Sequence, residues 1–333
     1  MNNISFVHTF WTKPALNDRW NVNKIDQIIK NIWYYTLSVV YIKRLYHNIE
    51  LHTDDFGMQC LDHIPYDKIH LTLNTIPDYI KPYSWAFGKF WALQYCPLNS
   101  AHIDGDVFVK SIKCLDKIYG YINEGYDGVF QNTEHGCTPN YPIYGDTVKL
   151  LSTLRYPDWG DRFGVTAYNT GFLLFNNQNY KDEFLSEYFR CHKDCGSNKV
   201  IAQQCELNRH ECPDLIIEQQ FMYDLAQHKK LKVGTLLQFS SMHNDANGIG
   251  YQHIIGKQKY DDYNIKNCTQ MLLRLDRELY VKTLNKCRQI SISESILDDP
   301  NIAAKDLSDV VENPFKYLAR LGPEVWEDEN KIR

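Results

Sequence analysis

The stretch SAHIDGDVFV, residues 100–109, carries two carboxylates, Asp104 and Asp106, at the end of an apolar run. A short apolar run that ends in polar residues is typical of a buried strand followed by a turn. Gly105, between the two acids, allows a tight turn and lets a ligand approach the backbone. Carboxylate oxygens at such a turn can hold Mg²⁺ or Mn²⁺ and leave positions open for the oxygens of a diphosphate. Two solvated acids in a turn would have the same sequence, so the surrounding residues decide.

The sequence around this stretch alternates between short apolar runs and longer segments with apolar residues at helical spacing. The expected order is strand 4–11, helix 24–47, strand 49–57, helix 84–96 and strand 100–109. This order predicts an α/β fold with a parallel, doubly wound sheet. Ligands of such sheets bind beyond the carboxyl ends of the strands, and the two acids are expected at one of these ends.

The rest of the chain adds one more predicted strand and then becomes helical. We expect a strand within 164–177, an amphipathic helix at 214–229 and a loop with a central glycine at 250–262. From residue 277 onward the chain is charged and shows no further strand pattern. We therefore expect a main domain at 1–276 and a helical C-terminal extension at 277–333.

The composition excludes several classes of protein. The 333 residues suffice for one large domain, and 36 basic against 41 acidic side chains give a net charge of −5. Since no run of Lys or Arg could follow a phosphate backbone or an anionic membrane, nucleic acid is not an expected partner. No apolar stretch reaches the ~18 residues of a transmembrane helix, and the first residues lack the pattern of a signal peptide. We expect a cytoplasmic protein without a transmembrane segment.

Ten cysteines are scattered along the chain, which favours reduced thiols in the core over a disulfide framework. A cysteine-rich segment at about 190–213 is interpreted as an insertion between two helices. Its metal-binding residue types are Cys191, Cys195, Cys205, Cys212, His192 and His210. Their spacing lacks the paired C-x-x-C of common zinc modules, so a zinc site is the alternative interpretation.

Four motifs follow one another between residues 85 and 260. They consist of Lys89 with Asp104 and Asp106; Asn169, Thr170 and Gly171; Glu218 and Gln219; and His253, Gly256 and Lys259. Together they resemble glycosyltransferase family 8, the retaining GT-A-fold enzymes related to glycogenin and to bacterial galactosyl- and glucosyltransferases. Thr170 stands where that family has Ser or Ala, Glu218 stands where it has Asp, and the family's usual Pro-Trp after the last motif is replaced. Residues 5–14 are also similar to uncharacterised bacterial glycosyltransferase-like proteins.

The resemblance implies a GT-A fold, which is a Rossmann-like, mixed and mostly parallel sheet flanked by helices. It also implies a UDP-sugar as donor and Mn²⁺, or Mg²⁺, as cofactor. The metal ligands would be Asp104, Asp106 and His253, since carboxylates and a neutral imidazole suit Mn²⁺. The residues expected to bind the nucleotide, its sugar or its phosphates are Phe6, Thr9, Lys89, Asp104, Gly256, Lys257 and Lys259.

For catalysis, the resemblance implies transfer of a sugar, glucose or galactose, with retention through a front-face mechanism. The leaving diphosphate would help to deprotonate the hydroxyl of an acceptor, which could be a glycan, a peptide or a small molecule. Gln219 would stabilise positive charge on the far face of the sugar, while Glu218 and Asn169 would bind donor or acceptor hydroxyls.

Several alternatives stay open at this point. Glu218 could act as the base of an inverting transferase, or it could be a helix N-terminal acid favoured by the dipole. A protein that binds a nucleotide sugar without turnover would carry the same motifs. A D-x-D after a buried strand also occurs in haloacid-dehalogenase-like phosphatases, but that pattern has Thr or Val where this chain has Phe108. Taken alone, His253 and Lys89 could be ordinary core or surface side chains.

Overall fold

The computed structural model describes residues 4–15, 24–81, 84–135, 166–197, 214–238 and 242–298. The strands are β1 (Ser5–Phe10), β2 (Ile49–Thr53), β3 (Lys68–His70), β4 (Ser100–Ile103), β5 (Val107–Val109), β6 (Gly128–His135), β7 (Thr166–Phe175), β8 (Val233–Thr235) and β9 (Tyr251–His253). The α-helices are α1 (Thr12–Ala15), α2 (Lys24–Arg44), α3 (Asp55–Leu61), α4 (Phe87–Leu93), α5 (Ile112–Asn123), α7 (Gln178–Ser197), α9 (Phe221–His228), α10 (Met242–Ile249), α11 (Asp262–Leu275) and α12 (Arg277–Asp298). A π-helix spans Leu215–Gln220, and 3₁₀ helices span Thr72–Thr75 and Gly256–Tyr260.

Seven strands form one sheet in the order β3-β2-β1-β4-β7-β6-β8. The pairs β3-β2, β2-β1, β1-β4 and β6-β8 are parallel, while β7 runs antiparallel to both β4 and β6. The prediction of an α/β fold with a mostly parallel sheet is confirmed. The chain proceeds from β1 outward to β2 and β3, and then crosses to β4 on the other side of β1. The carboxyl ends of β1 and β4 therefore flank a reversal of strand order, which is where sheets of this kind bind ligands.

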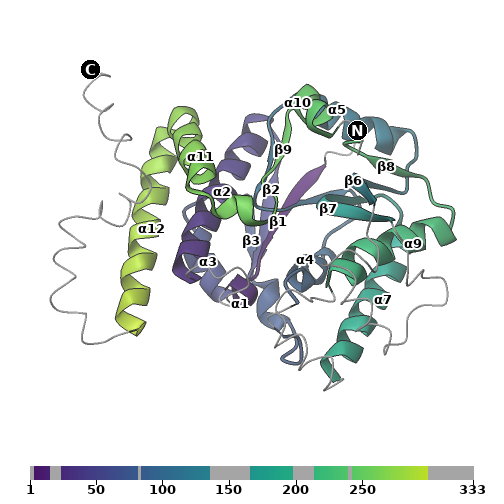
Figure 1. Cartoon of the computed structure of the whole chain (residues 1–333), viewed down its shortest axis with the longest axis horizontal. Coiled ribbons are helices and arrows are strands. Elements are labelled where there is room, and N and C mark those ends of the chain that lie inside the picture. Colours follow the sequence, from purple (N-terminus) through teal and green to yellow (C-terminus); the bar gives the residue numbers. More distant parts are fainter. Residues whose placement is uncertain are drawn as a thin grey trace.

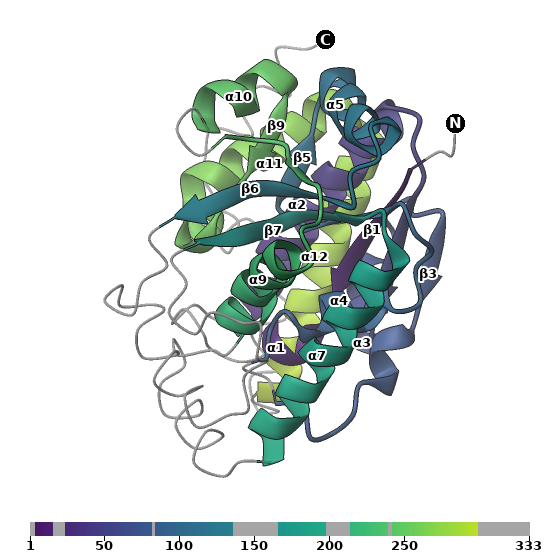
Figure 2. The same ribbon diagram turned by 90° about the vertical axis from the view of Figure 1, so that its right-hand side faces the viewer.

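Helices cover both faces of this sheet (Figure 1, Figure 2). Helices α2, α3, α11 and α12 lie on one side, and α4, α7 and α9 lie on the other. Side chains alternate along a strand, so Phe6 and Phe10 of β1 join the core under α2 while Val7 joins the core under α4. Both faces of the central strands are consequently apolar and buried, as is usual for parallel strands.

The predicted strand ends before the two acids, as expected, and residues 107–109 form a second strand that the sequence did not predict. Strand β4 ends at Ile103, the chain turns, and β5 begins at Val107 and pairs antiparallel with β9. The register sets Val107 opposite His253. The prediction of a loop at 250–262 was therefore wrong in part, because this segment begins with strand β9 and continues into a 3₁₀ helix. Strands of three residues are too short to show periodicity, and only their pairing makes them visible.

The described part of the expected C-terminal extension is α12, which begins at Arg277 and packs against α2 and α3. Its Leu279, Leu284 and Cys287 belong to the same core as α2. Asp276 separates α12 from α11 with an extended backbone conformation. Within the described residues, no helix combines the length and the apolar character that crossing a membrane requires.

The cysteine-rich segment is described in part. Cys191 and Cys195 are buried thiols on α7, and Nε2 of His192 lies 2.9 Å from Oδ1 of Asp214. The remaining members of the predicted group, Cys205, Cys212 and His210, lie outside the described residues. Zinc binding there stays the alternative interpretation, which the described residues do not test.

Candidate functional site

The turn between β4 and β5 holds the two acids of the D-x-D motif. The Asp104 amide donates a hydrogen bond to the carbonyl of Gly171 in β7 (2.9 Å), and the Ile254 amide donates to the carbonyl of Asp106 (3.1 Å). A Cβ on the glycine between the acids would lie 2.1 Å from Cε2 of Tyr35 in α2. The turn is therefore positioned by contacts with three other elements, and its glycine is required by close packing.

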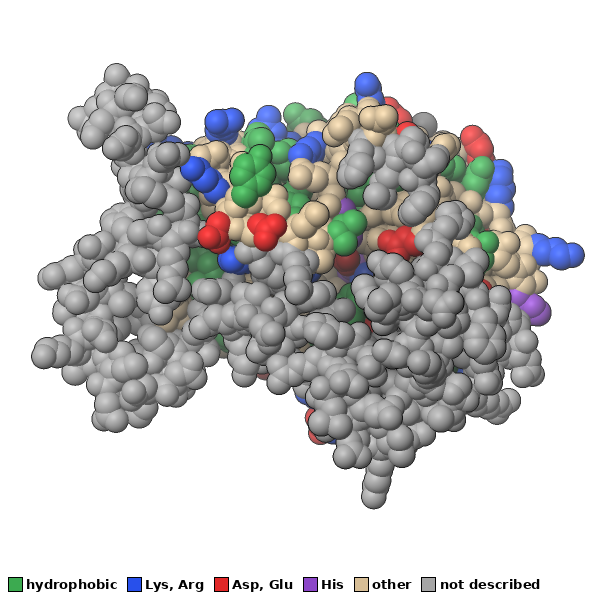
Figure 3. Space-filling view, in the orientation of Figure 1, with side chains coloured by type: hydrophobic (Ala, Val, Ile, Leu, Met, Phe, Trp, Pro, Cys, Tyr) green, Lys and Arg blue, Asp and Glu red, His purple; other side chains and the backbone are tan. Residues whose placement is uncertain are grey.

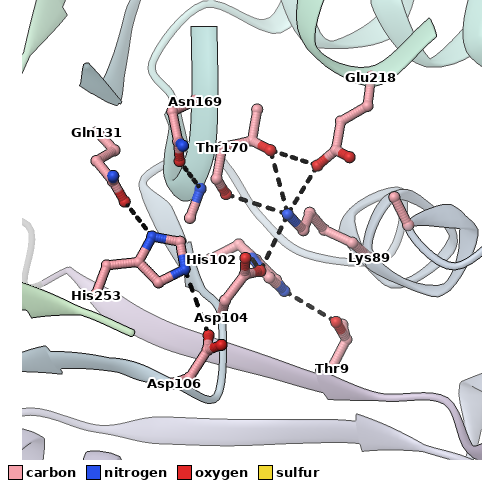
Figure 4. A network of polar contacts seen from close by, with 12 residues as sticks. Thr9, Lys89, His102, Asp104, Asp106, Gln131, Asn169, Thr170, Glu218 and His253 are labelled. Atoms are coloured by element: carbon pink, nitrogen blue, oxygen red, sulfur yellow. Dashed lines mark hydrogen bonds and ion pairs between the residues drawn. The ribbon is translucent and has the colours of Figure 1, made fainter. Parts of the chain in front are cut away.

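The predicted metal ligands converge. Ligand atoms of Asp104, Asp106 and His253 all lie within 4.8 Å of one another, and Figure 4 shows the imidazole pointing toward Asp106. Nε2 of His253 is 3.5 Å from Oδ1 of Asp106. This distance exceeds a hydrogen bond, but it suits two ligands that each lie ~2.1 Å from a shared ion. The side chains of Asp106 and His253 are only 9% and 10% exposed, so the donor set is recessed and fits a partly dehydrated divalent ion.

Lys259 lies against the same group. Its Nζ is 3.2 Å from Oδ2 of Asp106, and the hydroxyl of Tyr34 in α2 donates to the Lys259 carbonyl (2.8 Å). Burial would raise the pKa of Asp106, but the charges of Lys259 and His253 outweigh it and hold that pKa below its usual value. Asp106 is therefore a carboxylate over the whole physiological range, as a metal ligand must be.

The segment that carries Lys259 starts at Gly256. Gly256 has a φ of +62°, a conformation that favours glycine, and a Cβ there would meet nothing within 4 Å. Among the described residues, none fills the space beside this backbone. The Lys257 side chain lies outside what the structure describes, so its predicted phosphate contact stays a prediction.

Lys89 of α4 lies between the partly exposed carboxylate of Asp104 and the buried carboxylate of Glu218. Its Nζ lies 3.0 Å from Oδ1 of Asp104 and 2.8 Å from Oε1 of Glu218, and it donates to the carbonyl of Thr170 (3.1 Å). Burial would lower the pKa of Lys89, but the two carboxylates outweigh it and raise that pKa above its usual value. Lys89 is therefore a cation that orients Asp104, in addition to lining the pocket described below (Figure 4).

Glu218 does not meet a substrate hydroxyl in this conformation. The side chain has no exposed surface, it accepts hydrogen bonds from Lys89 and from the hydroxyl of Thr170, and burial raises its pKa. The expectation that Glu218 binds hydroxyls, or acts as a base, is corrected to a role in holding Lys89. Gln219 follows Glu218 on the π-helix and is 9% exposed.

Asn169 stabilises the strand that faces the D-x-D turn. Its amide nitrogen donates to Oε1 of Glu134 in β6 (2.7 Å), and its carbonyl oxygen accepts from the backbone amide of Gly171 (2.9 Å). The predicted contact of Asn169 with sugar hydroxyls is untested by this arrangement. The structure does bring its neighbour Thr170 to Lys89.

A pocket of about 180 Å³ opens beside the two acids. It is lined by the end of β1, one side of α2, the start of α4, the D-x-D turn and Lys259. Thr9, predicted to bind the nucleoside, lines it together with the aromatic rings of Trp11, Tyr35 and Trp85. Phe6 does not line it, and that prediction was wrong. Phe6 is the second residue of β1, fully buried in the core below the strand's carboxyl end.

Figure 3 shows one face of the molecule with its side chains coloured by type. Histidine, acidic and basic side chains lie together in a recess near the centre of the face that Figure 3 presents. A recess with mixed charges suits a ligand that carries both a metal ion and phosphates.

Sequence reasoning missed several polar residues behind the site. His102 of β4 contacts the Thr9 hydroxyl through Nε2 (2.9 Å), and burial followed by the Lys89 charge holds its pKa well below the usual value. Gln131 and Tyr251 form a second buried pair behind His253. The available signal was a polar residue inside a predicted apolar strand, as His102 is in SAHID.

A second group of side chains, Glu50, His52 and His70, also has ligand atoms within 4.8 Å of one another. Here the two imidazoles stack at 4.6 Å with planes 22° apart, and Nε2 of His70 is 3.0 Å from Oε2 of Glu50. The lone pairs of two nearly parallel rings do not point at one ion. The imidazoles already have hydrogen-bond partners, namely Glu50 for His70 and Thr72 for His52.

Replacing Gly171 by Ala is expected to disturb the metal site. The new Cβ would lie 2.5 Å from Oε1 of Gln131 and 2.5 Å from Cε1 of His253, and both groups are enclosed. We expect Mn²⁺ affinity to fall by about tenfold or more and stability to fall by about 1–3 kcal/mol, measured by calorimetry and thermal unfolding. Gly120→Ala, where a Cβ meets nothing within 4 Å, is the control. Unchanged Mn²⁺ affinity would contradict the described packing.

The fold and the site define an α/β protein with a candidate divalent-metal site at the strand-order reversal of its sheet. The chain belongs to DUF6734, a family of unknown function whose model matches residues 4–286. The match contains the sheet, the D-x-D turn and the segment with His253 and Lys259. No curated protein matches the sequence.

Proposed function

We propose that this protein is a metal-dependent glycosyltransferase of the GT-A type. It transfers glucose or galactose from a UDP-sugar to a hydroxyl of a glycan, a peptide or a small molecule, with retention at the anomeric carbon. The observation that carries the proposal is the convergence of Asp104, Asp106 and His253 at the strand-order reversal, beside a pocket that two lysines flank. The mixed, mostly parallel sheet supports the GT-A assignment.

The donor set is consistent with the proposed cofactor. Two carboxylates and one imidazole suit Mn²⁺ better than Mg²⁺, which prefers oxygen ligands. When bound there, a divalent ion would neutralise the charge that develops on a leaving diphosphate. Asp104, Asp106 and His253 are the residues that would hold it.

The chain's own residues supply the remaining functions. Lys259 carries a point charge and forms an ion pair with Asp106, and both residues line the pocket. Its ammonium group can leave Asp106 and bind the phosphate oxygens of a ligand there instead. Lys89 keeps Asp104 in place through a buried ion pair. The rings of Trp11, Tyr35 and Trp85 offer apolar faces against which a base or a sugar can stack.

The experiment that tests this proposal measures donor turnover. Purified protein is incubated with UDP-glucose or UDP-galactose in Mn²⁺ or in EDTA, and released UDP and sugar are followed by NMR. We expect slow hydrolysis that needs Mn²⁺ and yields the donor's anomer first. Release of the opposite anomer would mean an inverting transferase. If the protein binds UDP in a metal-dependent way but shows no turnover, it is a nucleotide-sugar-binding protein without catalytic activity.

The variant Gln219→Ala tests the proposed mechanism. If the amide oxygen of Gln219 stabilises positive charge on the sugar, its loss lowers the transfer rate more than it weakens donor binding, because that interaction strengthens in the transition state. Single-turnover rates at saturating donor measure this effect. The control is Gln227→Ala, at an exposed position of the next helix. A rate equal to the parent's, with a stability change of only ~0.5 kcal/mol, would make Gln219 an ordinary helix residue.

A further inference from the structure

Gln131 lies behind the metal ligand His253, in the middle of β6. Phe130 of β6 pairs with Leu173 of β7 and Asn132 pairs with Asn169, so Gln131 faces a β-bulge that residues 170–172 of β7 form. Bulges next to binding sites redirect a side chain out of the regular alternation. The Gln131 side chain is 1% exposed, and Figure 4 shows its amide oxygen facing the imidazole of His253.

Each polar atom of the Gln131 amide has a partner. Oε1 lies 2.8 Å from Nδ1 of His253 and accepts a hydrogen bond from the hydroxyl of Tyr251 (2.7 Å). Nε2 donates to Oδ1 of Asn132 (3.0 Å). Gly171 closes the group from β7, since a Cβ there would lie 2.5 Å from Oε1. The amide group is enclosed by these contacts, which oppose a rotation that would exchange its oxygen and nitrogen.

The direction of these hydrogen bonds is determined by one backbone carbonyl. The amide nitrogen of Asn132 donates to the carbonyl of Thr133 (3.2 Å), and a carbonyl can only accept. Oδ1 of Asn132 must then be the acceptor for Gln131 Nε2. It follows that Oε1 of Gln131 faces His253, and that Nδ1 of His253 carries a proton and donates it.

This direction has a consequence at the other ring nitrogen. A neutral imidazole with its proton on Nδ1 has a lone pair on Nε2, and Nε2 faces Oδ1 of Asp106 at 3.5 Å. A lone pair beside a carboxylate is unfavourable unless a cation lies between them. The hydrogen-bond chain from Thr133 through Gln131 thus prepares Nε2 for a metal ion.

We infer that Gln131 is a positioning residue that holds His253 in the Nδ1–H tautomer and so presents Nε2 to the metal. The inference rests on the metal site of the proposed function, but the tautomer itself can be observed without any metal. Partners of a ligating imidazole on the far side from the metal fix its orientation, and their loss typically lowers metal affinity by about 10- to 100-fold.

The first measurement is NMR of the His253 imidazole nitrogens in metal-free, isotope-labelled protein at alkaline pH. A His253→Gln variant assigns the signals. In the parent protein we expect a protonated Nδ1 and an unprotonated Nε2. In Gln131→Leu, Nδ1 has no acceptor, so the proton is expected to move to Nε2 and to be donated to Asp106. An Nε2–H tautomer in the parent would overturn the inference whether or not the protein binds metal.

The second measurement is Mn²⁺ affinity by calorimetry. We expect Gln131→Leu to bind Mn²⁺ about 10- to 100-fold more weakly than the parent. Gln131→Glu keeps an acceptor at the same reach, so it is expected to retain the Nδ1–H tautomer and to bind Mn²⁺ more tightly than Gln131→Leu. Gln252→Leu, at an exposed neighbouring position of β9, is the matched control. Thermal unfolding shows whether each variant is folded.

The outcomes separate the two proposals. A parent protein with the Nδ1–H tautomer that binds no Mn²⁺ would contradict the proposed function and leave the tautomer assignment intact. A parent that binds Mn²⁺ as tightly as Gln131→Leu would overturn the positioning role. Gln131→Leu and Gln131→Glu could also lose the same affinity while both retain the Nδ1–H tautomer. That result would make Gln131 a packing residue and would overturn the positioning role as well.

Discussion

Asp106→Asn is expected to abolish Mn²⁺-dependent binding of UDP while the protein stays folded. Among the residues that the structure describes, Asp106 is the carboxylate that contacts both His253 and Lys259. Asparagine keeps the shape of this side chain but removes its charge, and a neutral amide is a poor ligand for a divalent ion in a recessed site. Titration calorimetry with Mn²⁺ and UDP, added separately and together, measures the effect.

The matched control for this variant is Asp116→Asn, an exposed position on α5. It removes the same charge from a helix that does not line the pocket, and it is expected to bind like the parent. If Asp106→Asn bound Mn²⁺ and UDP as tightly as the parent, the assignment of the D-x-D turn as the metal site would be wrong. A variant that unfolds would show itself in the thermal scan and would be replaced by Asp104→Asn at the more exposed ligand.

Lys259→Ala is expected to lower turnover by about 10²-fold or more, the effect of removing one preorganised charge partner from a developing anion. The structure adds a second expectation. Nζ of Lys259 lies 3.2 Å from Oδ2 of Asp106, so a metal ion bound by this carboxylate must compete with this cation. We therefore expect Lys259→Ala to bind Mn²⁺ alone at least as tightly as the parent, although it turns over donor far more slowly.

Steady-state rates and Mn²⁺ calorimetry on the same samples test both expectations. Lys113→Ala on α5 serves as the charge-matched control, because its side chain is exposed. Unchanged hydrolysis and transfer rates in Lys259→Ala would exclude contact with the diphosphate. Weaker binding of Mn²⁺ alone would mean that Lys259 supports the metal site and does not compete with it.

The alternation of apolar runs and helical spacing was enough to predict the α/β class, because buried parallel strands and amphipathic helices each carry a local pattern. The same patterns predicted that Asp104 and Asp106 lie at a strand end. The resemblance to glycosyltransferase family 8 implied that His253 and Lys259 join them, and the structure brings all four together. Local signals succeed here because the D-x-D turn directly follows a strand that is recognisable by itself.

Contacts between distant segments were beyond these patterns. The pairing of β5 with β9 aligns Val107 with His253, and neither three-residue strand is long enough to show periodicity. The burial of Glu218 against Lys89 corrected a catalytic role to a supporting one, and the depth of Phe6 removed it from the pocket. The hydrogen bond from Asn132 to the carbonyl of Thr133 sets the direction of a chain that runs through Gln131 to His253. Sequence thus determined the α/β class, the strands β1, β2, β4 and β7 with the helices α2 and α4 between them, and the chemistry available at strand ends. Tertiary structure alone decided which polar groups face one another, because hydrogen bonds and ion pairs depend on distances that chain order does not specify.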